Sequence, residues 1–334
     1  MKNNKLCTAL VGCGTIAPVH LSALAELGVS EVVALCDVKV ERAEDLRARY
    51  AKDARVFTDF EEMLRAIPEI DAVHICTPHY LHTPMAVAAL EAGKHVFLEK
   101  PVGISEEDIA RLLDAEKKAK GKLCVCFQNR FNDTTAAIDR LVERYGAPTG
   151  CRAFVNWTRD EAYYTESGWR GFYATEGGGV MINQAIHTLD LMLRYMGKPL
   201  SLSATTANHH LKGVIEVEDT CEIFLRFEKG VGNFYATTSY AANASIILEL
   251  QFPAHTVSMI GGKVYDNGTL VPLSEDRTAT VGKDYWGKGP KGLISNFYHT
   301  VAEDLPVPVT PESGALSLSV LLAAYRSKGE TVTL

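Results

Sequence analysis

The chain begins with a short apolar segment that runs directly into a glycine-rich turn, and no other feature restricts its possible folds as strongly. The segment from Cys7 to Val11 predicts a buried strand, and a helix is expected to end near Leu27. The turn between them reads Gly12-Cys13-Gly14-Thr15-Ile16-Ala17. In a strand-turn-helix setting, this G-x-G-x-x-A spacing is typical of dinucleotide-binding domains, with the pyrophosphate at the helix N-terminus. Every residue of the turn is therefore a candidate cofactor-binding residue.

A carboxylate after the second predicted strand also indicates a dinucleotide ligand. Asp37 follows the strand 31–36 and lies 23 residues beyond Gly14, close to the offset of about 20 expected for the carboxylate that binds the adenosine ribose. A carboxylate there would repel a 2′-phosphate, so NAD is favoured over NADP, although Lys39 and Arg42 moderate this preference. An aspartate at a strand end can also simply form a turn or cap a helix.

Strands and helices alternate through the first part of the chain. Helices are expected at 41–50, 60–67, 84–92 and 105–120, and strands near Val56 and at 72–76, 95–98 and 123–127. This alternation predicts a doubly wound parallel sheet of the Rossmann type with right-handed crossovers. The first domain is expected to span residues 1–127 and the second 128–334.

The loop after the strand at 72–76 reads Thr77-Pro78-His79-Tyr80-Leu81-His82. Ligands bind at the carboxyl ends of strands in such sheets, so Thr77, Pro78, His79 and His82 are candidate cofactor contacts. A surface histidine that caps the next helix is an alternative for His79 and His82.

Glu99-Lys100-Pro101 follows the strand at 95–98 and supplies the candidate catalytic amine. Proline disfavours the helical conformation of the preceding residue, so Lys100 is expected to be extended, and its bond to Pro101 can be cis. A nicotinamide cation nearby would disfavour the ammonium form and bring the pKa of Lys100 toward the range useful for proton transfer. In isolation the tripeptide would more often be a surface Glu-Lys pair, so its interpretation depends on context.

Composition sets the broad class of protein. The 334 residues are enough for two domains, and a content of 47% hydrophobic and 22% charged residues is typical of globular proteins. The formal charge of −7 argues against nucleic acid or an anionic membrane surface as a partner. No segment approaches the roughly 20 apolar residues of a membrane-spanning helix, and the N-terminal apolar run is too short for a signal peptide. The cytoplasm is the expected location.

The eight cysteines lie mostly in apolar, strand-like segments and none forms a Cys-x-x-Cys pair. Reduced, buried thiols are therefore expected, and no metal site is predicted.

The second half of the chain has the pattern of an antiparallel sheet. Strands are expected at 151–157, 200–207, 220–227, 231–239, 245–250, 255–260 and 263–265, with hairpin turns at 228–230 and 266–268. A sheet of this kind, covered by helices on one face, favours a partner subunit on the other. The predicted fold is thus a Rossmann domain followed by an α+β domain with a large, mostly antiparallel open sheet.

Two segments of this domain carry candidate substrate contacts. Trp169 and Arg170 lie in an aromatic loop that includes Tyr163, and aromatic faces and an arginine fork suit sugars or carboxylates. A satellite core or an interface would explain the same loop. A helix is expected at 180–196, with one polar stripe formed by Asn183, His187, Asp190 and Arg194. Such a stripe is ordinary on an amphipathic helix, and His187 gains meaning only together with Lys100.

Four separated motifs resemble those of the Gfo/Idh/MocA oxidoreductases. They are the glycine-rich turn, Thr77-Pro78 with His82, Glu99-Lys100-Pro101, and the stretch GGGVMINQAIHTLD from Gly177 to Asp190. The resemblance covers almost the whole chain in order. It implies an N-terminal Rossmann domain, a C-terminal sheet used in forming a homodimer or homotetramer, and a sugar or cyclitol substrate. It also implies that the last helix, about 313–325, packs back on the first domain.

By this resemblance, Lys100 and His187 correspond to the catalytic lysine and histidine of the family. Lys100, Arg130, Trp169, Arg170, Asn183 and His187 are the candidate substrate-binding residues, and Glu99 and Lys100 are also candidate cofactor contacts. Asn183 stands where many members have aspartate, and an amide cannot exchange a proton. His79 replaces an asparagine common in the family.

The function expected from these features is NAD(P)-dependent oxidation of a secondary hydroxyl on a sugar, sugar derivative or cyclitol. Either Lys100 or His187 could accept the proton. One alternative is an NAD-dependent glycosidase that acts by transient oxidation and elimination. Another is a cofactor-binding sensor without catalysis, which Asn183 makes conceivable.

Overall fold

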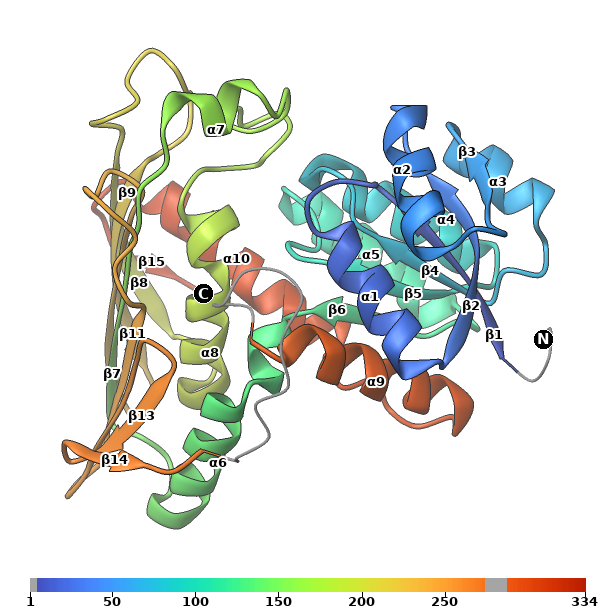
Figure 1. The fold of residues 1–334 in the computed structure, drawn as a ribbon. Coiled ribbons are helices and arrows are strands. Elements are labelled where there is room, and N and C mark those ends of the chain that lie inside the picture. Colours follow the sequence, from blue (N-terminus) through green and yellow to red (C-terminus); the bar gives the residue numbers. More distant parts are fainter. Residues whose placement is uncertain (1–4, 274–286) are drawn as a thin grey trace. The chain divides into compact units, whose positions relative to one another are not determined.

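The computed structural model describes residues 5–273 and 287–334. The chain forms two compact units, each assembled from two segments of sequence (Figure 1). The first unit combines Met1–Phe131 with Thr278–Ala315, and the second combines Asn132–Arg277 with Leu316–Leu334. The predicted domains were continuous in sequence, whereas the described residues 287–315 group with the first unit.

The sheet of the first unit has six parallel strands in the order β3-β2-β1-β4-β5-β6. The strands are β1 (Leu6–Val11), β2 (Ser30–Cys36), β3 (Arg55–Phe57), β4 (Ala72–Ile75), β5 (His95–Glu99) and β6 (Leu123–Cys126). The strand order changes direction between β1 and β4, which creates the crevice where doubly wound sheets bind ligands. The predicted Rossmann topology is confirmed.

Helices of the first unit connect these strands. They are α1 (Ala17–Leu27), α2 (Val40–Tyr50), α3 (Phe60–Ala66), α4 (His82–Glu91) and α5 (Glu106–Lys118), with short 3₁₀ helices at His79–Leu81 and Gln128–Phe131. At the start of α5, the Ser105 hydroxyl accepts from the backbone N–H of Asp108, as a capping box requires. The Asp108 carboxylate instead accepts from the N–H of Ile104.

One helix of the first unit was missed in the sequence. Helix α9 (Gly289–Ala302) packs against α1 and β6 through a face that includes Leu293, Ile294 and Phe297, all fully buried. Helix α10 (Pro311–Ser327) follows it; its first turn, to Ala315, belongs to the first unit and the remainder to the second. The C-terminal helix that packs on α1 is therefore α9. The helix that the sequence predicted for this role, at about 313–325, is the later helix α10.

The sheet of the second unit has nine strands in the order β14-β13-β12-β11-β7-β10-β9-β8-β15. The strands are β7 (Gly150–Asn156), β8 (Ser201–Ala207), β9 (Thr220–Phe227), β10 (Gly230–Thr237), β11 (Ile247–Gln251), β12 (Thr256–Ile260), β13 (Lys263–Asp266), β14 (Thr269–Val271) and β15 (Val332–Thr333). Only β7 and β10 pair in parallel among these described strands, so the sheet is mostly antiparallel, as predicted. Asn267 and Gly268 both have positive φ and make the tight turn between β13 and β14.

Helices α6 (Asp133–Tyr145) and α8 (Ile186–Met196) lie on one face of this sheet (Figure 1). The predicted helix 180–196 begins differently, because Met181–Ala185 forms a π-helical segment in which the N–H of Ala185 donates to the carbonyl of Val180. Such single wide turns occur often at functional sites. A further short helix, α7 (Glu161–Thr165), lies in the aromatic loop.

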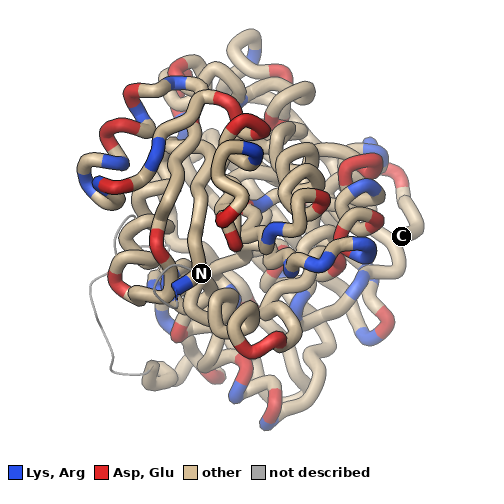
Figure 2. The backbone as a smooth tube through the Cα atoms, turned by 90° about the vertical axis from the view of Figure 1, so that its right-hand side faces the viewer, with Lys and Arg blue, Asp and Glu red and all other residues tan. Residues whose placement is uncertain are grey.

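The described part of the chain contains no helix long and apolar enough to span a membrane. Figure 2 shows lysine and arginine interleaved with aspartate and glutamate along the backbone. A few of these charges form exposed pairs within one helix, such as Arg49 with Asp45 in α2. Pairs of this kind add little to stability.

Candidate active site

The glycine-rich turn has the shape that a bound pyrophosphate needs. Gly12 has a φ of +89°, and a Cβ at this position would lie 2.5 Å from the carbonyl carbon of Cys76, the residue after β4. Only glycine therefore lets the turn approach β4 so closely. A Cβ on Gly14, in contrast, would meet no heavy atom within 4 Å, so space is open beside it. That space lies just before α1, whose first N–H groups can bind an anion.

Asp37 ties this turn to the end of β2. Its buried carboxylate accepts hydrogen bonds from the backbone N–H groups of Cys13 and Lys39, each at 2.8 Å. The turn-forming and ribose-binding interpretations are compatible, since each carboxylate oxygen has a second lone pair.

The loop after β4 holds two buried histidines, so the interpretation of His79 and His82 as surface residues was wrong. The His82 ring lies between two backbone carbonyls, with Nδ1 2.6 Å from the oxygen of Pro101 and Nε2 2.8 Å from that of Thr77. Burial lowers the pKa of His82, so a neutral ring donates to one of them. The His82 ring thus lies in contact with the loops that follow β4 and β5. Its contact with the cofactor, like that of His79, stays a prediction.

Thr77 offers a hydroxyl to a ligand at this edge of the sheet. Its Oγ1 is buried, and no hydrogen-bond partner for it exists among the described residues. Buried hydroxyls are normally paired. Together with the open space beside Gly14, this hydroxyl fits a dinucleotide bound across the carboxyl ends of β1 and β4.

Lys100 directly follows β5, the strand next to β4, and is half-buried. Its peptide bond to Pro101 is cis, as the sequence allowed. The side chain before it, Glu99, is buried, and its Oε1 lies 3.0 Å from Nε2 of His20. Burial disfavours the Glu99 carboxylate, but the hydrogen bond and charge of His20, followed by the charge of Lys100, prevail and lower its pKa to about 2. The predicted cofactor contact of Glu99 stays a prediction.

Three ligand-type atoms of the first unit come within 4.8 Å of one another, on His20, Glu99 and Cys126. The hydrogen bond between His20 and Glu99 already pairs two of them. Burial also raises the pKa of the Cys126 thiol well above its usual value, which disfavours a thiolate ligand. The group is thus explained as a hydrogen-bonded cluster.

The second unit carries the candidate substrate contacts on and around the π-helical segment. Asn183 lies within this segment, and His187 is the second residue of α8; both are half-buried. The predicted polar stripe does not continue along α8. Asp190 is buried against Ser317, and the exposed Arg194 pairs with Asp139.

Asn183 contacts a buried carboxylate that the sequence analysis did not select. Its Nδ2 donates to Oε1 of Glu176, whose Oε2 accepts from the N–H of Gly171. Burial raises the pKa of Glu176 to about 7, against the effects of these hydrogen bonds and of the Arg170 charge. The one signal in the sequence is its position directly before the three glycines Gly177 to Gly179.

The aromatic loop is anchored to the same place. The guanidinium of Arg170 lies over the rings of Tyr163 and Trp169, 4.5 and 4.7 Å from their centroids. The hydroxyl of Tyr163 accepts from Nε2 of Gln184 at 3.0 Å and from Nδ2 of Asn183 at 3.4 Å. The structure therefore brings Trp169, Arg170 and Asn183 into one cluster.

Arg130 belongs to the first unit, in the 3₁₀ helix that follows β6. Its Nη1 donates to the hydroxyl of Ser313 at 2.8 Å, within the same unit. The substrate contact predicted for Arg130 stays a prediction.

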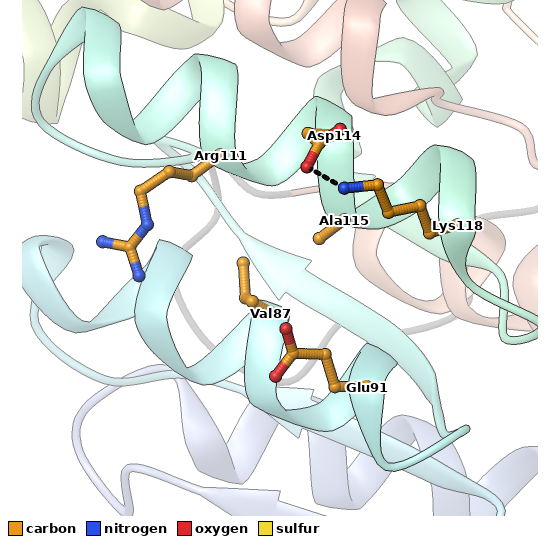
Figure 3. Close-up of a pocket in the computed structure, with 6 residues that line it drawn as sticks. All are labelled: Val87, Glu91, Arg111, Asp114, Ala115 and Lys118. Atoms are coloured by element: carbon orange, nitrogen blue, oxygen red, sulfur yellow. Dashed lines mark hydrogen bonds and ion pairs between the residues drawn. The ribbon is translucent and has the colours of Figure 1, made fainter.

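A hollow between α4 and α5 is lined by Val87, Glu91, Arg111, Asp114, Ala115 and Lys118 (Figure 3). It lies along the later turns of both helices, which run away from the carboxyl ends of the strands. Lys118 and Asp114 form an ion pair at its rim. The hollow is therefore separate from the site at Gly14 and Lys100.

Fold and site together define a dinucleotide-binding oxidoreductase with a second, sheet-based unit. Residues 6–127 match the model of an oxidoreductase family with an NAD-binding Rossmann fold, and residues 136–256 match the GFO/IDH/MocA C-terminal domain. The chain belongs to the Gfo/Idh/MocA family of oxidoreductases, as the resemblance predicted.

Individual relatives match over nearly the whole length. D-glucoside 3-dehydrogenase from Escherichia coli K12 is 31% identical over 100% of this chain and 98% of its own. 1,5-anhydro-D-fructose reductase from Ensifer adhaerens is 30% identical over 95% of each. The WlbA dehydrogenase from Bordetella pertussis, solved in complex with NADH and UDP-GlcNAcA, superposes with a TM-score of 0.87 at 29% identity, covering 100% of this chain and 99% of that one.

Proposed function

We propose that the protein catalyses the reversible oxidation of a secondary hydroxyl on a sugar, sugar derivative or cyclitol, with NAD as the preferred cofactor. The observation that carries the proposal is the position of Lys100, which follows the strand beside the β1/β4 crevice on a sheet whose glycine turn has room for a pyrophosphate. The full-length similarity to D-glucoside 3-dehydrogenase supports the substrate class.

In this proposal the first unit binds the cofactor and the second presents the substrate. NAD, when bound, supplies the nicotinamide ring that accepts the hydride. Lys100 or His187 takes the hydroxyl proton, while Asn183, Trp169, Arg170 and Arg130 orient the substrate. The Asn183 amide is well suited to this task when Glu176 is ionised, because a carboxylate can only accept and so fixes Nδ2 on its side. Oδ1 is thereby directed away from Glu176 as an acceptor for a substrate hydroxyl.

The proposal includes a homodimer or homotetramer formed through the sheet of the second unit. Helices α6 and α8 lie on one of its faces (Figure 1). On β9 and β10, Phe224 and Val231 are 36% and 44% exposed. Apolar side chains on an open sheet face favour a partner subunit.

The cytoplasm is the proposed location. All eight cysteines are buried and free of disulfides, which agrees with a reducing compartment.

The test is NADH formation across a panel of glucosides, free sugars, inositols and nucleotide sugars, with NAD and NADP run in parallel. Lys100→Met should lose nearly all turnover while it still binds NADH. Lys94→Met is the matched control, since Lys94 lies just before the same strand and its Nζ donates to the carbonyl of Pro68. Turnover by Lys100→Met at the rate of the control would overturn the role of Lys100. Bond cleavage without net NADH would point to a glycosidase, and nucleotide binding without turnover of any substrate would point to a sensor.

A further inference from the structure

Five side chains of the first unit form a continuous buried chain of hydrogen bonds that ends at the residue before Lys100. The contacts are Thr8 Oγ1 to Tyr298 Oη at 2.6 Å, Tyr298 Oη to His74 Nε2 at 3.0 Å, His74 Nδ1 to His20 Nδ1 at 2.9 Å, and His20 Nε2 to Glu99 Oε1 at 3.0 Å. All five residues are buried. They come from α1, α9 and three strands of the sheet.

The chemistry of the groups fixes the direction of every bond when Glu99 is ionised and both rings are neutral. A carboxylate can only accept, so His20 donates from Nε2 and must accept at Nδ1. His74 then donates from Nδ1 and accepts at Nε2 from the Tyr298 hydroxyl. Tyr298 in turn accepts from Thr8. Each donor therefore points toward Glu99.

The groups around the chain add little competing charge. Burial lowers the pKa of His74 well below its usual value, and a positive charge on His20 would lower it further, so His74 stays neutral. The thiols of Cys76 and Cys126, which face His20 and Glu99, are kept protonated because burial raises their pKa. Lys100 is the charged residue at the Glu99 end of this hydrogen-bonded chain. At the other end, the charge of Asp71 raises the pKa of Tyr298, with a smaller effect than burial. Phe97 stacks on His74 and excludes water from the middle of the chain.

We propose that His20, His74 and Tyr298 are positioning residues that hold Glu99 as a carboxylate and thereby set the pH at which Lys100 accepts the proton of the substrate. This rests on the proposed function, in which Lys100 is the proton acceptor. A negative charge on the adjacent side chain favours the ammonium form of Lys100. Losing the donor from His20 leaves the buried Glu99 with only the weak thiol donor of Cys126 and the charge of Lys100, so burial disfavours its carboxylate form and the pKa of Lys100 falls.

The experiment measures kcat/KM for sugar oxidation against pH. The rate rises with pH as Lys100 loses its proton, so His20→Leu should move this rise to lower pH by about one unit. His20→Gln keeps an N–H in place of Nε2 and should retain the wild-type profile. The same comparison at the next position, His74→Leu against His74→Asn, should give a smaller shift in the same direction.

A purely structural role predicts a different result. In that case His20→Leu would lower the melting temperature without moving the pH profile, as expected of Met63→Ala, a buried substitution in α3. Tyr298→Phe removes only a hydroxyl and keeps the ring, so it decides the question if the histidine variants do not fold. The proposal would be overturned if every folded variant of His20, His74 and Tyr298 had the same dependence of kcat/KM on pH as the wild type. Failure of the proposed function is seen separately, as full activity of Lys100→Met.

Discussion

The side-chain amide of Asn183 donates to the buried carboxylate of Glu176, with 2.5 Å between Nδ2 and Oε1. Many members of the family carry an aspartate at the position of Asn183. In this chain a carboxylate lies beside that position, and the loop before the helix supplies it. Glu176 is fully buried, and its carboxylate contacts the half-buried Asn183.

Glu176→Gln should reduce the loss of stability at rising pH. Burial raises the pKa of Glu176 from 4.5 to about 7, so the folded protein holds this proton more tightly than the unfolded chain. The contribution of Glu176 to the free energy of unfolding is therefore fully present below pH 4.5. It declines by about 3 kcal/mol as the pH rises toward 7. Melting temperatures between pH 5 and 8 test this, with the exposed Glu216→Gln as control. Burial also raises the pKa of Glu218 to about 7, so the Glu176→Gln variant should still lose some stability as the pH rises. Equal pH dependence in Glu176→Gln and wild type would contradict the expectation.

Substitutions of the two glycines of the turn should have different effects, one on stability and the other on NADH binding. Gly12→Ala places a methyl group against the backbone after β4 at a positive φ, so it should lower the melting temperature of the protein without cofactor. Gly14→Val points into open space and should leave that temperature nearly unchanged, while NADH binding weakens at least roughly tenfold because the side chain occupies the place of the pyrophosphate. Thermal melts and NADH fluorescence titrations distinguish them. Tight NADH binding by Gly14→Val would refute this placement.

His187→Asn should lower kcat by roughly 10² to 10⁴, as expected when a group that transfers a proton is lost. The fold should persist, because His187 is half-buried at the start of α8. His209→Asn, an exposed histidine of the same unit, serves as the control. Steady-state kinetics with the best substrate of the panel checks the result, and a kcat within twofold of the control would remove His187 from the reaction.

Phe224→Glu should convert the proposed oligomer to monomers. The substitution places a charge on the open sheet face of β9, where burial against a partner would leave it unpaired. Light scattering coupled to size exclusion reports the mass. Leu305→Glu, an exposed leucine of the first unit, should keep the wild-type mass. An unchanged mass for Phe224→Glu would place the interface elsewhere.

The features that the sequence predicted best are local. The turn from Gly12 to Ala17 and the strand before Lys100 combine period, spacing and residue chemistry within a few positions, so their placement needed no knowledge of distant contacts. The hairpin at Asn267-Gly268 is a further case, since both residues tolerate the positive φ that the turn requires.

The features that were missed depend on partners far away in sequence. Helix α9 is apolar on the face that meets α1, nearly 270 residues earlier, and nothing nearby marks it as part of the first unit. His20 and His74 are 54 residues apart in the sequence, and only the fold brings their rings together. The wide turn at Met181–Ala185 inserts one residue into a helical pattern, which a period of 3.6 does not reveal.

The return of α9 to the first unit has a consequence for how the protein is made. Phe297 and Tyr298 complete the core around Phe97 and His74, yet they are translated only after the entire nine-stranded sheet except its last strand. The nucleotide-binding unit therefore cannot complete its folding until α9 has been synthesised. In a fragment that ends before α9, Phe97 and His74 on the central strands would lack these aromatic contacts.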